Sequence, residues 1–188
     1  CHKEVFFFFF SRYALRDMVV LSLLIGLNVV LTCIASICIF ILGVESLRIG
    51  FGAVPVIFAG LFFGPRAGAV VGALGDVAGF IMSPAGGAFM PHFTLTAALT
   101  GAIPPLALRL FRHREHVAEH SFIELLVAIA AGQLITSVLM VPYFLNMLFG
   151  VPFTATLIVR LQTQLLQIPL FVMCIKLLAR RLPFIVAG

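Results

Sequence analysis

The sequence predicts an all-α membrane protein in which six helices cross the bilayer as a single integral-membrane domain, residues 1–188. The first observation is composition, because 62% of the residues are hydrophobic, only 10% are charged, and the mean hydropathy is +1.21. A water-soluble domain of this size exposes too much surface to carry so few polar residues. The second is that the apolar residues form long stretches near the ~20 residues that one helical crossing requires. The third is that these stretches lack the alternation of a membrane β-barrel.

Polar residues, glycine and proline separate the apolar stretches. Only Gly64 and Pro65 lie between the second and third stretch, and we interpret them as a turn at a membrane face because Arg66 follows. The other breaks are the polar loop from Gly43 to Gly50, the turn from Ser83 to Gly87, the hydrophilic connection from Arg112 to His120, and Gly150-Val151-Pro152 at the end of the fifth span. The predicted spans are 17–42, 51–64, 66–82, 92–111, 122–148 and 153–179.

Most basic side chains fall on one side of the membrane when the chain is threaded through the six predicted spans. Arg48 falls on the opposite side and Arg160 lies within the sixth span. An excess of Lys and Arg marks the cytoplasmic face, so we expect both termini in the cytoplasm and the loops at 43–50, 83–92 and 147–153 outside. The net charge of +5 is thereby explained without nucleic acid. The basic residues on the predicted cytoplasmic side are Lys3, Arg12, Arg16, Arg66, Arg109, Arg112, Arg114, Lys176, Arg180 and Arg181.

Motifs for catalysis are missing from the sequence. It contains no Walker A motif, HExxH or GxSxG. The four cysteines have no metal-ligand spacing, and we interpret His116 and His120 as part of a solvated charged loop rather than a metal site. We therefore expect no enzyme, no metal and no resident cofactor. The classes left are a passive pore, an ion-driven carrier and the membrane part of a larger machine.

Two ionisable residues interrupt the predicted spans. Asp76 and Arg160 each lie about six residues from the outer end of a span, roughly 9 Å below the outer surface at 1.5 Å per residue. Charged groups inside a membrane are costly and usually line a cavity or pair with one another. The two residues form either a structural ion pair or the wall of an outward-facing ligand pocket. We favour the pocket because other polar groups converge on this layer.

A polar stripe along the sixth span supports that pocket. Arg160, Thr163, Gln164 and Gln167 follow helical spacing and share one face, which must point at protein or water. In the inner half, Gln133, Thr136 and Ser137 are interpreted as interhelical hydrogen bonds rather than ligand contacts. The residues that other segments contribute to the outer layer are Arg48, Phe51, His92, Thr94, Tyr143 and Asn146.

Small residues predict close helix contacts. In the third span, Gly68, Gly72, Gly75 and Gly79 lie on one face with Asp76, a pattern that lets helices approach closely. In the first span, Ser22 and Gly26 form a second pair of small residues one turn apart. That pair serves either packing within the chain or docking of another membrane protein.

Three segments resemble the folate-specific substrate-binding (S) components of energy-coupling factor (ECF) transporters. They are FGAVP from Phe51, FFGPRAGAVVGALGDVAGFI from Phe62 and PHFTLTAALTG from Pro91. The resemblance implies a six-helix S-component bundle in a prokaryotic plasma membrane and capture of folate from outside. It also implies partners, namely one transmembrane coupling subunit and two cytoplasmic ATPases that hydrolyse the ATP. Members of the family usually carry Ala-x-x-x-Ala for this docking, and Ser22 and Gly26 occupy the matching places.

Folate chemistry suits the outer layer. Arg160 or Arg48 is predicted to bind carboxylate, for which a guanidinium is the best partner. Gln164, Asn146 or Asp76 is predicted to read the pterin edge. The residues predicted to supply stacking surface or the rim of the site are Phe51, Phe89, Tyr143 and His92.

Other functions stay open at this stage. An S component for a different vitamin would share the same fold. An autonomous secondary transporter would need an inverted repeat or broken helices, and we detect neither in the sequence. An intramembrane enzyme would rest on His92 with Asp76, which is weak support.

Overall fold

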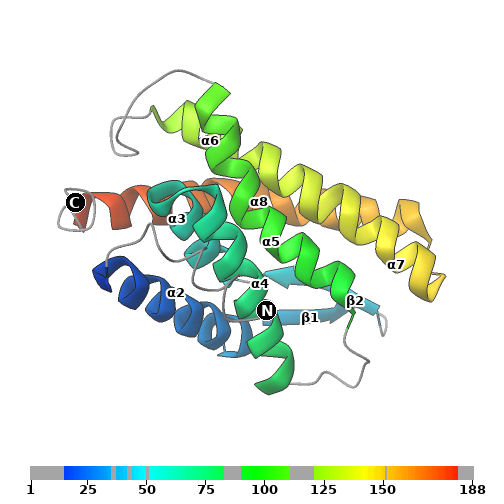
Figure 1. The fold of residues 1–188 in the computed structure, drawn as a ribbon. Coiled ribbons are helices and arrows are strands. Elements are labelled where there is room, and N and C mark those ends of the chain that lie inside the picture. Colours follow the sequence, from blue (N-terminus) through cyan, green and yellow to red (C-terminus); the bar gives the residue numbers. More distant parts are fainter. Residues whose placement is uncertain are drawn as a thin grey trace.

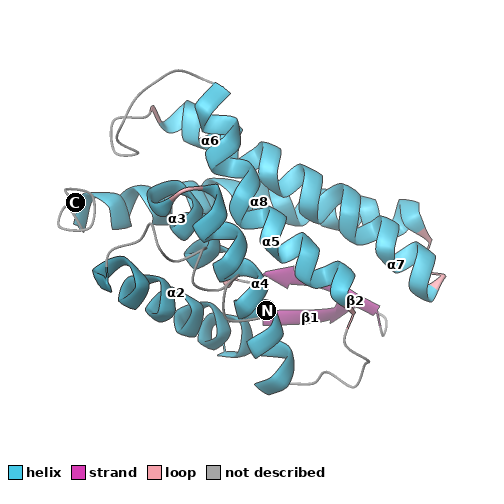
Figure 2. Cartoon of the chain, in the orientation of Figure 1, coloured by secondary structure: helices cyan, strands magenta, loops and turns pink. Residues whose placement is uncertain are grey.

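The computed structural model describes residues 15–34, 37–41, 44–49, 51–82, 90–110, 121–150 and 152–181. These ranges form a bundle of helices with one two-stranded antiparallel sheet beside it (Figure 1). Figure 2 shows that helix dominates the described chain. In chain order the elements are α2 (Leu15–Ile34), β1 (Ile37–Ile41), β2 (Val44–Ile49), α3 (Ala53–Phe63), α4 (Pro65–Met82), α5 (Pro91–Leu110), α6 (Phe122–Gln133), the π-helical segment η2 (Leu134–Met140), α7 (Val141–Phe149) and α8 (Phe153–Arg181).

Helices long and apolar enough to cross a membrane account for most of the predicted spans. Among the described residues five qualify, and α6, η2 and α7 count together as one of them. The remaining predicted span, 51–64, corresponds to α3, which is apolar but has only 11 residues. The helical membrane fold predicted from the sequence is thus confirmed, except for the two strands β1 and β2. The sidedness of the chain stays a prediction.

The first predicted span is wrong at its outer end. It was expected to run over 17–42, but α2 ends at Ile34, and the segment after it forms β1. The predicted polar loop at 43–50 contains β2, which pairs with β1 so that Ile37 faces Ile49 and Cys38 faces Arg48. β-Branched and aromatic residues favour strands, and a short apolar run such as Ile-Cys-Ile-Phe-Ile fits either a helix or a strand by hydropathy alone. Hydropathy therefore extended the helix too far.

Glycine marks two of the turns between helices. Gly64 has a φ of 95°, which side-chain-bearing residues rarely adopt, and Pro65 then begins α4 with the φ that a first helical position needs. The predicted turn between the second and third spans is therefore confirmed. Gly150 ends α7 with a φ of 66°, and its N–H donates to the carbonyl of Asn146 at 3.0 Å.

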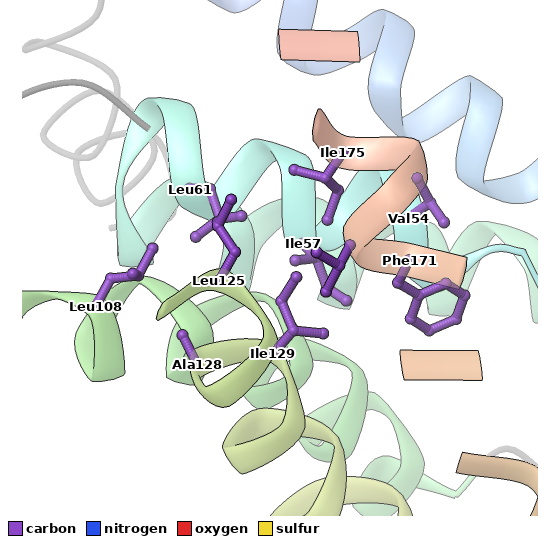
Figure 3. Close-up of a cluster of buried hydrophobic side chains, with 10 residues drawn as sticks. Val54, Ile57, Leu61, Leu108, Leu125, Ala128, Ile129, Phe171 and Ile175 are labelled. Carbon is purple, nitrogen blue, oxygen red and sulfur yellow. The ribbon is translucent and has the colours of Figure 1, made fainter. Parts of the chain in front are cut away.

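Helix α3 lies at the centre of the bundle. Its residues from Val54 to Leu61 are all buried, which explains why the helix is hydrophobic on every side. One face packs against α5, α6 and α8, and Figure 3 shows side chains from these four helices pointing toward one another. The opposite face packs against α2 and α4. The residues in the first of these clusters are Val54, Ile57, Leu61, Leu108, Leu125, Ala128, Ile129, Phe171, Val172 and Ile175.

Backbones of α3, α4 and α5 approach one another at glycines. A Cβ on Gly68 would lie 2.6 Å from the Gly60 Cα and 2.8 Å from the Gly101 carbonyl carbon. Gly72 meets the backbone of Ala97 in the same way. The predicted close approach along α4 is thus confirmed for these two glycines. It is not seen for Gly79, where an added Cβ would meet no atom of the described residues within 4 Å.

Candidate functional site

The polar stripe on α8 faces the protein. Thr163, Gln164 and Gln167 are 4%, 4% and 6% exposed, although hydrophobic residues on both sides of them are exposed. This burial confirms that the stripe points into the bundle. Arg160, one turn nearer the start of α8, is half-buried. The Thr163 hydroxyl donates to the Val159 carbonyl at 2.9 Å, so its hydrogen bond is made within the helix.

Asp76 joins α4 to α5 near the start of α5. Its Oδ2 accepts a hydrogen bond of 2.7 Å from the Thr94 hydroxyl, and both side chains are half-buried. A hydroxyl bound to a carboxylate makes a short, charge-assisted hydrogen bond. This contact holds one carboxylate oxygen of Asp76 in place. The structure thus brings together two residues of the predicted outer layer.

An aromatic group lies where α5 begins and α7 passes. The His92 ring centroid is 5.0 Å from that of Phe144, and Phe144 in turn makes an edge contact of 5.8 Å with Tyr143. Tyr143 is 59% exposed, and His92 is exposed as well. The sequence placed His92 and Tyr143 in the same layer but missed Phe144, whose position one residue after Tyr143 gave no separate signal.

The remaining predicted residues are dispersed. Asn146 is exposed near the end of α7, and Phe51 is half-buried just before α3. Arg48 is part of β2, where its backbone pairs with Cys38, and its side chain lies outside the described part of the structure. Phe89 also lies outside the described residues.

Ser22 and Gly26 lie on an exposed side of α2. The Ser22 hydroxyl donates to the Met18 carbonyl at 2.8 Å within the helix. Within the described ranges, a Cβ on Gly26 would meet no atom within 4 Å. Of the two alternatives, packing within the chain receives no support here, and docking of a partner stays a prediction.

A second polar layer lies deeper in the bundle, where α6 becomes the π-helical segment η2. The Thr136 and Thr100 hydroxyls are 3.1 Å apart, which confirms a contact between helices. Ser137 donates to Gln133 Oε1 at 2.9 Å, so this bond is made along one helix and not between helices as expected. Two buried atoms have no hydrogen-bond partner among the described residues, namely Gln133 Nε2 and Gln164 Oε1. No sequence pattern indicates these orphaned atoms, because hydrogen-bond satisfaction depends on side-chain packing.

Metal ligands do not gather in the described ranges. No group of three His, Cys, Asp or Glu side chains comes together there in a way that would hold an ion. The chemistry that these residues offer is hydrogen bonding, aromatic contact and the two charges of Asp76 and Arg160. Such a combination can bind a polar organic ligand.

Comparison with solved structures supports the same fold. The chain superposes with a TM-score of 0.72 on a structure described as FolT bound with folic acid, at 23% identity over 92% of this chain and 96% of that one. It superposes with a TM-score of 0.64 on the S component of a bacterial ECF transporter, at 19% identity over 92% of this chain and 98% of that one. At these identities the likeness establishes the fold alone.

Comparison of sequences identifies the family. The chain is 40% identical over 86 residues to the folate transporter FolT of Clostridium novyi (strain NT), and the match covers 46% of each chain. The aligned part is thus about half the length of that relative. The family model described as "ECF transporter, substrate-specific component" matches residues 16–179. This match spans nearly all of the described helices, and the chain therefore belongs to the family of substrate-specific components of ECF transporters, which are integral membrane proteins.

Proposed function

We propose that this chain captures folate at the outer face of a prokaryotic plasma membrane as the substrate-binding subunit of an ATP-driven importer. The observation that carries the proposal is the 40% identity to a folate transporter, within a chain whose family supplies substrate specificity. The likeness of fold to a folate-bound S component agrees with it. ATP is then hydrolysed by partner subunits, in keeping with a sequence that lacks nucleotide-binding motifs.

The side chains of the outer layer match the chemistry of folate. The glutamate tail of folate carries carboxylates, which suit the guanidinium of Arg160 or Arg48. The pterin edge offers adjacent donors and acceptors, which suit Gln164, Asn146 or Asp76. Stacking surface for the flat rings would come from Phe51, Tyr143 and Phe89, with His92 at the rim.

Docking to the importer would use the exposed face of α2. Ser22 and Gly26 are small and lie on this face, so another membrane helix can approach the α2 backbone closely. The partners would be one transmembrane coupling subunit and two cytoplasmic ATPases, with lipid covering the rest of the surface. Exposed apolar side chains on the same helix, including Val19, Leu23 and Leu27, suit contact with a partner helix or with lipid.

Binding to the purified protein tests the proposal directly. The protein in a mild detergent is titrated with folic acid, riboflavin, thiamine and pantothenate, and the heat of binding is measured. We expect saturable one-to-one binding of folic acid alone. If a well-folded sample binds another of these vitamins and not folic acid, the chain is an S component of different specificity.

Transport by the isolated chain tests the division of labour. Liposomes that contain only this protein should not accumulate labelled folate, whereas liposomes that also contain the coupling subunit, the ATPases and ATP should. Accumulation driven by an ion gradient without the partners would instead identify a secondary transporter.

A further inference from the structure

Two buried glutamine side chains each hold one polar atom that makes no hydrogen bond to the described part of the chain. Gln133 is 2% exposed and Gln164 is 4% exposed, and the atoms in question are Gln133 Nε2 and Gln164 Oε1. One is a donor and the other an acceptor. Burying a polar group without a partner destabilises a protein, so such atoms in a native fold call for an explanation.

The orientation of the Gln133 amide is set by its neighbour. The Ser137 hydroxyl donates to Gln133 Oε1 at 2.9 Å, which leaves Nε2 as the outstanding donor. Gln133 is the last residue of α6, and the π-helical segment η2 begins directly after it. π-Helical turns are rare and occur frequently at functional sites, because they displace side chains from regular helical packing.

The packing of α6 against α8 brings the two glutamines to neighbouring levels. Leu125 and Ile129 of α6 share a core cluster with Phe171 and Ile175 of α8, and the two helices run in opposite directions (Figure 1). Gln133 is one turn beyond Ile129 on α6, and Gln167 and Gln164 are about one and two turns before Phe171 on α8. Because the helices are antiparallel, we infer that Gln133 and Gln164 lie at neighbouring levels.

Two further buried polar residues close to these glutamines along the chain, Thr136 and Thr163, are uncharged. Thr136 is 1% exposed and is hydrogen-bonded to Gly132 and Thr100, while Thr163 is hydrogen-bonded within α8. Their hydroxyls are therefore already engaged. One outstanding donor and one outstanding acceptor suit a neutral group that offers the complementary pair. A carboxylate only accepts hydrogen bonds, so it cannot bind Gln164 Oε1.

We propose that Gln133 Nε2 and Gln164 Oε1 bind the neutral heterocyclic edge of the ligand, with Gln133 donating to a ring carbonyl or ring nitrogen and Gln164 accepting from a ring N–H or amino group. This inference rests on the proposed function, and it assigns Gln133 a role in specificity that the sequence did not indicate. The ligand would then lie with its uncharged ring end deep in the bundle and its carboxylates toward Arg160.

Methionine variants separate this role from a structural one. Methionine matches glutamine closely in shape and lacks the amide, so Gln133→Met and Gln164→Met remove the outstanding atoms and change the volume little. In Gln133→Met the Ser137 hydroxyl loses its side-chain acceptor. It can donate instead to the backbone carbonyl of residue 133, four residues earlier in the helix. We expect each variant to weaken folic acid binding about tenfold or more, and to raise the Tm of the ligand-free protein because an unsatisfied group is gone.

Pteroic acid shows which end of the ligand is affected. It retains the pterin and lacks the glutamate, so the two methionine variants should lose the same factor of affinity for pteroic acid as for folic acid. Thr136→Val is the matched control, because it removes a hydroxyl that is already hydrogen-bonded at the same level. We expect it to lower the Tm and to leave both affinities unchanged.

Several results would overturn the inference. Unchanged folic acid affinity in Gln133→Met would exclude the ring contact, as would a loss of affinity for folic acid that is not seen with pteroic acid. A fall in the Tm of both ligand-free variants would show that the amides are satisfied inside the protein. If the wild-type protein binds no folic acid, the proposed function fails, and the ligand-free Tm values still decide whether the two amides are unsatisfied.

Discussion

Replacing Gly68 with alanine tests whether the three-helix contact at the centre of the bundle is as tight as the structure indicates. The added Cβ would lie 2.6 Å from the Gly60 Cα in α3 and 2.8 Å from the carbonyl carbon of Gly101 in α5. Ordinary carbon contacts measure about 3.5–4.0 Å, so the deficit is about 1 Å on two sides at once. Both neighbours are backbone atoms, which cannot rotate away, and a shift of α4 from one helix does not relieve both.

The expected change in the free energy of unfolding combines two opposing contributions. Overpacking of this kind costs up to about 3 kcal/mol, while alanine stabilises a helix by about 1 kcal/mol relative to glycine. We therefore expect a net loss of about 2 kcal/mol, or a fall in Tm of about 4–8 °C for a chain of this size. The midpoint of thermal unfolding in one fixed detergent measures it.

A glycine on the same helix provides the control. At Gly79 an added Cβ would meet no atom within 4 Å in the part of the chain that the structure describes, so only the difference in helix propensity applies there. Gly79→Ala should leave the Tm unchanged or raise it by a few degrees. Equal Tm values for Gly68→Ala and Gly79→Ala would refute the inferred backbone contact.

Three further predictions concern single polar contacts. Thr94→Val removes the donor to the Asp76 carboxylate and should cost about 1.5–3 kcal/mol of stability; an unchanged Tm would mean that this hydrogen bond contributes nothing. Thr136→Val removes the contact with Thr100 and should lower stability by about 1 kcal/mol, measured by thermal unfolding, and a Tm equal to that of the wild type would argue against it. Arg160→Ala should weaken folic acid binding by about 2 kcal/mol, or about thirtyfold, in calorimetric titration, whereas unchanged affinity would reduce Arg160 to a structural role.

Much of the fold could be predicted from hydropathy because lipid imposes the same rule on every span. A long apolar run must become a helix in the bilayer, and the breaks at Gly64 and Gly150 fell where the backbone turns. The outer end of the first span could not be predicted in this way. The strand Ile37–Ile41 is as hydrophobic as a helix, and its pairing with Val44–Ile49 depends on a contact between segments that hydropathy does not report.

For the candidate site, features set within one helix could be predicted from the sequence, whereas contacts between helices could not. Helical spacing predicted the burial of Gln164 and Gln167, because a polar stripe cannot face lipid. Spacing could not show that Asp76 is bound by Thr94, since that contact joins two helices. It also gave no sign of the orphaned donor on Gln133, because hydrogen-bond satisfaction depends on neighbours that only the folded chain brings together.

The two consecutive prolines of α5 explain why glycines crowd around Gly101. Pro104 and Pro105 have no N–H, so the carbonyls four residues earlier, one of them on Gly101, lack their usual helical donor. The Cα–H groups of Gly60 and Gly68 lie against that carbonyl, and only glycine allows this approach and the weak C–H···O contact that it brings. Over evolutionary time, the prolines and the glycines should therefore be retained or replaced as a set, so that a relative with an ordinary α5 helix is free to carry larger residues at positions 60 and 68.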